Sequence, residues 1–287
     1  MNDAVRPDVA GREGSLARKE RALRDILAGL DGVIVAFSGG VDSAYLACVA
    51  RSELGDRALC ITADSPSYPR RHRDMALRLV RQLGLRHEFI QTREMERPEY
   101  RANPADRCYF CKEELYTQLS RIARERGIAA IVDGNNADDR GDYRPGREAA
   151  RRFGVRSPLD EADLTKGEIR QLSRAAGLPT WDEPASACLS SRIPYASEVT
   201  GEKLQAIDAA ENLLRDLGFR VCRVRHHGDT ARIEMDPDQM RRALDDDVRA
   251  TILRELHALG FRYVTLDLQG YRTGSLNEVL TLTPVNG

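Results

Sequence analysis

The chain has 287 residues, of which 41% are hydrophobic, so it is long enough to bury one large hydrophobic core or two modest ones. Its 44 lysines and arginines nearly balance 45 aspartates and glutamates, and the net charge of -1 does not indicate nucleic acid or an anionic membrane as a partner. The N-terminal residues lack the apolar segment of a signal peptide and no later run reaches membrane-spanning length, so we expect a soluble, cytoplasmic protein without a membrane partner.

Segments with helix and strand patterns alternate along the first two thirds of the chain. The expected helices are residues 15–28, 42–52, 69–83 and 112–126. The expected strands are residues 32–37, 56–65, 86–92 and 128–136. Strands separated by helices predict an α/β fold with a doubly wound parallel sheet, whose ligands bind at the carboxyl ends of the strands. We place this domain at residues 1–195.

A smaller α+β domain is expected over residues 196–287. It begins with a helix over 197–219 that Thr200 would cap, followed by a hairpin over 220–235 with a Gly-Asp turn. The sequences LRDLGFR and LHALGFR each end a helix and lead into a strand. This pattern predicts two short helix–strand units that share one small sheet.

The run SGGVDS, residues 38–43, joins the end of an expected strand to the start of an expected helix. The glycines let the backbone approach a ligand, the serines supply hydroxyl donors, and the helix N-terminus adds partial positive charge, so the run predicts a phosphate site. The spacing lacks the Gly-Lys-Ser/Thr of the Walker loop and the G-x-G-x-x-G of dinucleotide folds. It therefore disfavours γ-phosphate hydrolysis and hydride transfer; a tight glycine turn without a ligand is the plain alternative.

SGGVDS resembles the PP-loop of the ATP pyrophosphatases, which are adenine nucleotide alpha hydrolase-like enzymes that cleave ATP to AMP and pyrophosphate. The resemblance implies ATP and Mg²⁺ as cofactors and an adenylated oxygen of the substrate as the second product. It also implies that the departing pyrophosphate is held by the residues of the run, which are Ser38, Gly39, Gly40, Val41, Asp42 and Ser43.

The six cysteines of a chain without extracellular features are expected to be reduced thiols or cluster ligands rather than disulfides. Three lie in apolar or alternating runs and are expected in the core, namely Cys48, Cys60 and Cys222. Cys108 and Cys111 form a C-x-x-C pair, and Cys188 lies in a polar, proline-flanked loop. A partial zinc knuckle, plain packing and a redox pair are the alternatives for the C-x-x-C pair.

The motifs SGGVDS, RCYFCK, DGNNADDRGDYRPG, ACLSSRIPY and GYRTGSLNE, in this order, resemble the LarE sulfur transferase family over nearly the whole chain. The resemblance implies an enzyme that adenylates the carboxylates of pyridinium-3,5-biscarboxylic acid mononucleotide and converts them to thiocarboxylates. This reaction belongs to the synthesis of the nickel-pincer nucleotide cofactor of lactate racemase. A small nucleotide substrate and a homo-oligomer, a hexamer by resemblance, are therefore expected.

The resemblance also implies that Cys188 handles the sulfur. In one branch of the family this cysteine gives up its own sulfur and becomes dehydroalanine; in another, three cysteines hold a 4Fe-4S cluster whose free iron carries hydrosulfide. Because Cys108, Cys111 and Cys188 are all present, we favour the cluster, with sulfide or another sulfur donor as a partner. The sacrificial cysteine remains the alternative.

A loop rich in Asp, Asn and Gly follows the fourth expected strand and is too polar to pack in a core. Candidates in it for the nucleotide, its Mg²⁺ and the α-phosphate are Asp133, Gly134, Asn135, Asp138, Asp139, Asp142 and Arg144. Ser65 and Ser67 follow the second strand, where PP-loop proteins receive adenine and ribose. Lys112 and Arg192 are candidates to neutralise the adenylate beside the sulfur source.

Arg223 and Arg225 alternate on an expected strand, so both guanidinium groups point to one face. They predict a fork for the phosphate of the nucleotide substrate, which Arg272 completes; a solvated arginine face is the alternative. Glu211 and Glu234 are candidate acids of the substrate or metal site by family position.

The competing functions are a PP-loop tRNA thiolase, an amidating synthetase and a noncatalytic iron-sulfur or zinc binding module. Near-neutral charge disfavours an RNA-binding enzyme, so no nucleic-acid partner is expected. An amidating synthetase would need an ammonia source, and a binding module would not need a pyrophosphate loop.

Overall fold

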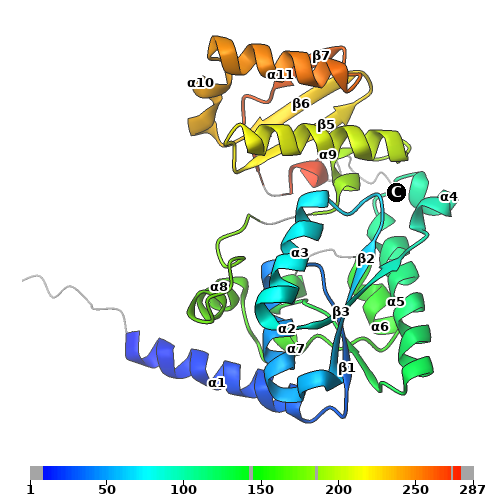
Figure 1. The fold of residues 1–287 in the computed structure, drawn as a ribbon, viewed down its shortest axis with the longest axis vertical. Coiled ribbons are helices and arrows are strands. Elements are labelled where there is room, and N and C mark those ends of the chain that lie inside the picture. The colour runs from blue at the N-terminus through cyan, green and yellow to red at the C-terminus, as the bar shows by residue number, and fades with distance from the viewer. Residues whose placement is uncertain (1–8, 142–144, 185–186, 273, 279–287) are drawn as a thin grey trace, which may run out of the picture. The chain divides into compact units, whose positions relative to one another are not determined.

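The computed structural model describes residues 9–141, 145–184, 187–272 and 274–278. The chain forms two compact units and passes between them several times, and Figure 1 draws the elements of both. The first unit consists of Met1–Asp64, Asp74–Thr92 and Lys112–Glu183. The second consists of Ser65–Arg73, Arg93–Cys111 and Pro184–Gly287.

The first unit is built on a parallel sheet of order β3-β2-β1-β4. Its strands are β1 (Val33–Ala36), β2 (Ala58–Asp64), β3 (Arg86–Gln91) and β4 (Ala130–Val132). The apolar runs of β1 and β2 are buried, as in sheets that helices cover on both faces. The strand order reverses between β1 and β4, which is where ligands bind in doubly wound folds. The predicted α/β fold class is confirmed.

Helices connect these strands and pack on the sheet (Figure 1). They are α1 (Val9–Ala28), α2 (Val41–Leu54), α3 (Arg70–Leu83), α5 (Arg107–Arg126), α6 (Pro145–Arg152), α7 (Pro158–Glu161) and α8 (Lys166–Ala175), with 3-10 turns η1 (Gly55–Arg57) and η3 (Ala137–Gly141). The sequence did not predict α6, α7 and α8. A capping box starts α8, in which Thr165 accepts from the Glu168 backbone and Glu168 accepts from the Thr165 backbone.

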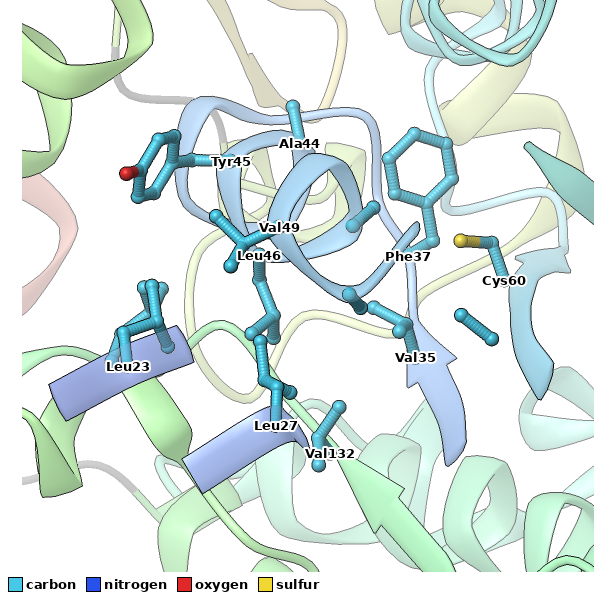
Figure 2. Close-up of a cluster of buried hydrophobic side chains, with 14 of the residues drawn as sticks. Leu23, Leu27, Val35, Phe37, Ala44, Tyr45, Leu46, Val49, Cys60 and Val132 are labelled. Atoms are coloured by element: carbon cyan, nitrogen blue, oxygen red, sulfur yellow. The ribbon is translucent and has the colours of Figure 1, made fainter. Parts of the chain in front are cut away.

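The core of the first unit joins α1, α2, α8 and the strands in one apolar cluster. Figure 2 shows Leu27 of α1 pointing to Leu46 of α2 and lying beside Val132 of β4. Cys60 is buried in the same cluster, and Cys48 packs against it. Both cysteines are therefore the core residues that their apolar surroundings predict.

The C-terminal part of the second unit is a three-stranded sheet of order β5-β6-β7 with its helices. The elements are α9 (Gly201–Asp216), β5 (Cys222–His227), β6 (Thr230–Met235), η5 (Pro237–Gln239), α10 (Met240–Ala243), α11 (Asp246–Ala258), β7 (Tyr263–Leu266) and η6 (Ser275–Asn277). β5 and β6 form the expected hairpin, and β7 pairs parallel to β6. Phe219 and Phe261, from the two similar LGF sequences, are buried in one cluster with Cys222. The predicted α+β architecture is confirmed.

The second unit also takes in η2 (Glu94–Glu96), α4 (Pro98–Arg101) and η4 (Leu189–Arg192). Leu189 and Ile193 pack with Leu204 and Ile207 of α9 and with Tyr100 of α4. Residues 187–195, expected in the first domain, therefore belong to the second compact unit. The two domains 1–195 and 196–287, as a division of function, stay a prediction. Within the described ranges, no helix is long and apolar enough to cross a membrane.

Candidate functional site

The PP-loop leaves β1 and enters α2 in the first unit. Gly39 has a positive φ of 73°, and a Cβ there would lie 3.1 Å from the Ala76 Cβ, so the position requires glycine. The Ser38 and Ser43 hydroxyl oxygens are 3.1 Å apart, and Ser43 donates to the Gly40 carbonyl oxygen at 3.1 Å. Gly40 is the N-cap of α2 and makes no side-chain cap bond. The loop thus leaves the first turn of a 14-residue helix for an anion.

Asp42 lies in the first turn of α2, and one of its carboxylate oxygens accepts a hydrogen bond from Lys166 Nζ. The other oxygen, Oδ1, is buried and has no hydrogen-bond partner among the described residues. Burial raises the pKa of Asp42, although the positive charge of Lys166 opposes the shift. A buried carboxylate oxygen without a partner fits a cation such as Mg²⁺, which prefers oxygen ligands. Lys166 was not predicted from the sequence, although the T-x-x-E spacing around it is a helix-start signal.

The loop after β4 approaches the PP-loop closely. A Cβ at Gly134 would lie 3.0 Å from the backbone nitrogen of Ser43 and 3.3 Å from the Asp42 Cβ. Asp138 accepts from the Lys166 backbone nitrogen at 2.8 Å. The structure therefore brings Gly134 and Asp138 to the PP-loop, as the sequence predicts for the ends of β1 and β4.

Asp133 and Asn135 stabilise this loop through hydrogen bonds. Asp133 accepts from Tyr116 Oη at 2.8 Å, from Ser157 Oγ at 2.7 Å and from Asn135 Nδ2 at 2.7 Å. Both carboxylate oxygens of Asp133 are engaged, so its contacts are those of a residue that holds the loop. The predicted candidates Asp142 and Arg144 lie outside the described residues.

The three candidate sulfur cysteines all lie in the second unit. Cys108 and Cys111 stand three residues apart in the first turns of α5, which begins five residues earlier than expected, and Cys188 directly precedes η4. Cys188 and Cys111 lie close enough to Tyr100, and Cys188 and Cys108 close enough to Arg107, for their ionised forms to interact electrostatically. The three thiols thus share one neighbourhood.

Three thiols beside a buried guanidinium fit an anionic iron-sulfur cluster in donor type and charge. Across the parts of the chain that the structure describes, however, no group of three or more His, Cys, Asp or Glu side chains is arranged to hold a metal ion. The cluster therefore stays a prediction.

Arg192 ties the Cys188 segment to α9. It is 1% exposed, donates from Nη1 to the Cys188 carbonyl oxygen at 3.0 Å and pairs with both Glu211 oxygens at 2.8 and 3.1 Å. Burial alone would raise the pKa of Glu211, but Arg192, Arg223 and Arg215 outweigh it and lower this pKa to about 2. Glu211 is therefore an anion at neutral pH and pairs with the buried Arg192.

The predicted phosphate fork lies in β5, where Arg223 and Arg225 are both buried. Arg225 pairs with both oxygens of Glu234 at 2.9 and 2.6 Å. Arg223 donates to the carbonyl oxygen of the preceding residue at 2.7 Å. Arg272 pairs with Glu278 at 3.0 and 3.1 Å. The predicted acid Glu234 is thus the counter-ion of a predicted phosphate ligand.

Three further predicted residues have only local contacts. The Ser65 hydroxyl oxygen lies 2.9 Å from that of Ser67, in the second unit. The Lys112 ammonium lies 5.4 Å from the centre of the Tyr116 ring.

Besides Lys166, sequence reasoning missed several buried or half-buried polar residues of the second unit. Glu94 is 1% exposed, with one oxygen that has no partner among the described residues. Burial and then the charges of Arg215, Arg192 and Arg223 lower the pKa of His72 to about 4. Tyr100 and Arg107 lie near the candidate sulfur cysteines. The sequence does not show that these side chains are buried, although Arg107 stands in the motif RCYFCK, because burial of a polar side chain depends on tertiary packing.

One protein family and several individual proteins are similar to this chain in sequence. Residues 17–130 match the NAD synthase family. This chain is 47% identical to an uncharacterized protein of Synechocystis, over 93% of this chain and 99% of that protein. It is 39% identical to the pyridinium-3,5-bisthiocarboxylic acid mononucleotide synthase of Lactiplantibacillus plantarum, over 93% of this chain and 96% of that enzyme. One subunit of the glutamine-hydrolyzing GMP synthase of Methanopyrus kandleri is 27% identical over 64% of this chain and 62% of its own length.

The match to the mononucleotide synthase has the identity and the coverage that establish common family membership, and it extends through residues of both compact units. The shorter NAD synthase and GMP synthase matches agree with the PP-loop at the start of α2. The chain therefore belongs to the family of the pyridinium-3,5-bisthiocarboxylic acid mononucleotide synthase, the family that its motifs resemble.

Proposed function

We propose that this chain is an ATP-dependent sulfurtransferase that adenylates the carboxylates of pyridinium-3,5-biscarboxylic acid mononucleotide and converts them to thiocarboxylates. The observation that carries the proposal is the set of three cysteines around Tyr100 and Arg107 in a chain of this family. Cytoplasmic location and a hexameric assembly stay predictions.

Adenylation is the task of the PP-loop. A substrate carboxylate oxygen attacks the α-phosphorus of ATP, and pyrophosphate leaves with the bonding electrons. The N–H groups at the start of α2 and the serine hydroxyls bind the pyrophosphate, while Asp42 would hold Mg²⁺ through the oxygen that lacks a partner. Lys166 fixes the other oxygen of Asp42 and adds positive charge where negative charge develops.

Sulfur transfer is the task of the cysteine neighbourhood. A sulfur nucleophile attacks the carbonyl carbon of the acyl adenylate, and AMP leaves. Arg192 positions the Cys188 segment through its bond to the Cys188 carbonyl oxygen and its pair with Glu211. When bound by Cys108, Cys111 and Cys188, a 4Fe-4S cluster would supply an iron site for sulfide; the sacrificial alternative uses the sulfur of Cys188 itself.

The substrate's phosphate is assigned to the arginines of β5. Arg223 and Arg225 are buried side by side in period-two spacing, and the Glu234 pair fixes the orientation of Arg225. Arg272 completes the fork. Glu211 and Glu234 act here as counter-ions of the arginines.

The test is incubation of anaerobically purified protein with ATP, Mg²⁺ and the biscarboxylate nucleotide, with and without sulfide. Pyrophosphate release is measured, and the masses of the product and of the protein are determined by mass spectrometry. We expect pyrophosphate release and a product with sulfur in place of carboxylate oxygen. Pyrophosphate without any sulfur in the product, or an amide product when ammonia is supplied, would favour the amidating synthetase that the GMP synthase similarity suggests.

The cysteine variants separate the two sulfur sources. With a cluster, Cys108→Ala, Cys111→Ala and Cys188→Ala each lose sulfur transfer and keep pyrophosphate release. With a sacrificial cysteine, only Cys188→Ala is inactive, and wild-type protein becomes lighter at Cys188 by the mass of H₂S. Cys60→Ala, in the hydrophobic core of the first unit, is the matched control for thiol loss.

A further inference from the structure

Arg107 is a buried arginine beside the candidate sulfur cysteines. Its side chain is 3% exposed, and it stands at the start of α5 next to Cys108. Its Nη1 donates to Asn103 Oδ1 and, at 3.0 Å, to the Ser190 carbonyl oxygen. Both acceptors are neutral. Its Nε–H is buried and has no hydrogen-bond partner among the described residues.

A buried cation requires compensating negative charge, because removal of a charge from water costs several kcal/mol. Two comparable buried arginines of the second unit pair with carboxylates, Arg192 with Glu211 and Arg225 with Glu234. Within the described part of the chain, no carboxylate is hydrogen bonded to Arg107. Cys188 and then Cys108 have the strongest electrostatic interactions with Arg107 when their thiols are ionised.

Asn103 makes this position rigid. It is fully buried with a positive φ of 56°, and its Nδ2 donates to the carbonyl oxygens of Ile193, Pro194 and Ser197 at 3.2, 2.7 and 3.1 Å. These three residues follow Cys188 closely in the chain. The guanidinium is therefore bound, through Asn103 and Ser190, to the segment that carries Cys188.

We propose that Arg107 is the counter-charge of an anionic sulfur site, a positioning residue whose buried guanidinium and unpartnered Nε–H hold thiolate or hydrosulfide sulfur between Cys108 and Cys188. The inference rests on the proposed function for the use of that sulfur. It applies to either sulfur source, because a cluster bound by thiolates and a free Cys188 thiolate both bring negative charge to this place.

The test measures the local charge at each thiol without any catalysis. Iron-free protein is alkylated with neutral iodoacetamide or with anionic iodoacetate at one pH, and the rates at Cys188 and Cys108 are measured by peptide mass spectrometry. The ratio of the iodoacetate rate to the iodoacetamide rate cancels the fraction of thiolate and reports the electrostatic potential at the sulfur. In wild type this ratio should exceed that of N-acetylcysteine amide at both cysteines.

Arg107→Met should lower the ratio about tenfold, the effect of one positive charge near a partly buried site, and Arg107→Lys should keep most of it. Arg101→Met is the matched control, because Arg101 is exposed, lies in α4 of the same unit and pairs with Glu198. Its ratio should equal that of wild type.

An unchanged ratio in folded Arg107→Met protein would overturn the proposal. If Arg107→Met does not fold, a wild-type ratio equal to that of N-acetylcysteine amide would overturn it as well. The alkylation needs neither ATP nor nucleotide, so failure of the charge site and failure of the sulfurtransferase function are separate results.

Discussion

Replacement of Lys166 by methionine should destabilise the first unit in a way that depends on the charge of Asp42. Lys166 is the hydrogen-bonded cation of a carboxylate whose other oxygen is buried without a partner among the described residues. Methionine keeps the length of the side chain and removes the charge. The carboxylate of Asp42 then loses its cation, so the folded state loses stability.

The magnitude follows from the exposure of the pair, which is 33% for the lysine side chain and 21% for the aspartate side chain. Loss of one partner from a fully buried pair costs about 3–5 kcal/mol, whereas an exposed pair contributes at most about 1 kcal/mol. Because this pair is partly screened by water, we expect a loss of about 2 kcal/mol at pH 8.

The pH dependence has a definite sign. Burial raises the pKa of Asp42 in the folded state above its unfolded value, so its contribution to stability is fully present below the unfolded pKa and is lost as the pH rises through the folded one. Without Lys166 the folded pKa rises further. The difference between variant and wild type should therefore shrink as the pH falls from 8 toward about 4.

Urea unfolding followed by tryptophan fluorescence measures this directly, because Trp181 is the single tryptophan of the chain and lies in the first unit beside Arg174. The matched control is Asp42→Asn with Lys166→Met, which has no charge to compensate and should recover most of the loss. Equal instability of the single and double variants, or a loss that does not change with pH, would refute this account.

Two further predictions concern the second unit and the approach of the two loops. Glu211→Gln removes the anion shared by buried arginines, and thermal unfolding should show a loss of about 3–5 kcal/mol at pH 7. Because the pKa of Glu211 in the folded state is lowered to about 2, the greater stability of wild type should persist above the pKa of the unfolded state and disappear as the pH falls toward 2. A difference in stability that does not change with pH would contradict the charge argument. Gly134→Ala should slow pyrophosphate release at least about tenfold, because the added Cβ would push the loop after β4 away from the PP-loop and misplace catalytic groups. Gly167→Ala is the control, since its Cβ would meet nothing within 4 Å, and it should leave the rate of pyrophosphate release unchanged. Equal rates in the two variants would show that the close approach of Gly134 to Ser43 is unimportant.

The fold of the first unit was predictable because its signals are local. Buried apolar strands and the PP-loop lie in short continuous segments, so β1 to β4 were located within a few residues. The boundary of the second unit was not predictable, because Leu189 and Ile193 join it through contacts with α9 that are distant in sequence. The start of α5 was placed late, since the C-x-x-C pair has no periodic apolar pattern of its own.

In the candidate site, too, residues in local motifs were predictable from the sequence, whereas those that depend on tertiary packing were not. The PP-loop residues and the cysteines were named from motifs, and their roles stay predictions. Lys166, Arg107 and Glu94 were missed, because the sequence does not indicate which charged side chain tertiary packing will bury. Arg225 was expected as an open phosphate ligand, and its bidentate pair with Glu234 depends on strand register.

The second unit is assembled from three separate stretches of chain, and this affects the order in which a growing polypeptide can fold. Tyr100 leaves the ribosome about ninety residues before Ser190, whose hydroxyl oxygen lies 2.6 Å from its own, and still earlier than Ile207 of the same apolar cluster. During synthesis, the apolar side chains of residues 93–111 therefore stay exposed to solvent until the last third of the chain has left the ribosome. A fragment that begins at residue 196 would lack Tyr100, Leu189 and Ile193, so isolated expression of the C-terminal region should yield an incomplete core.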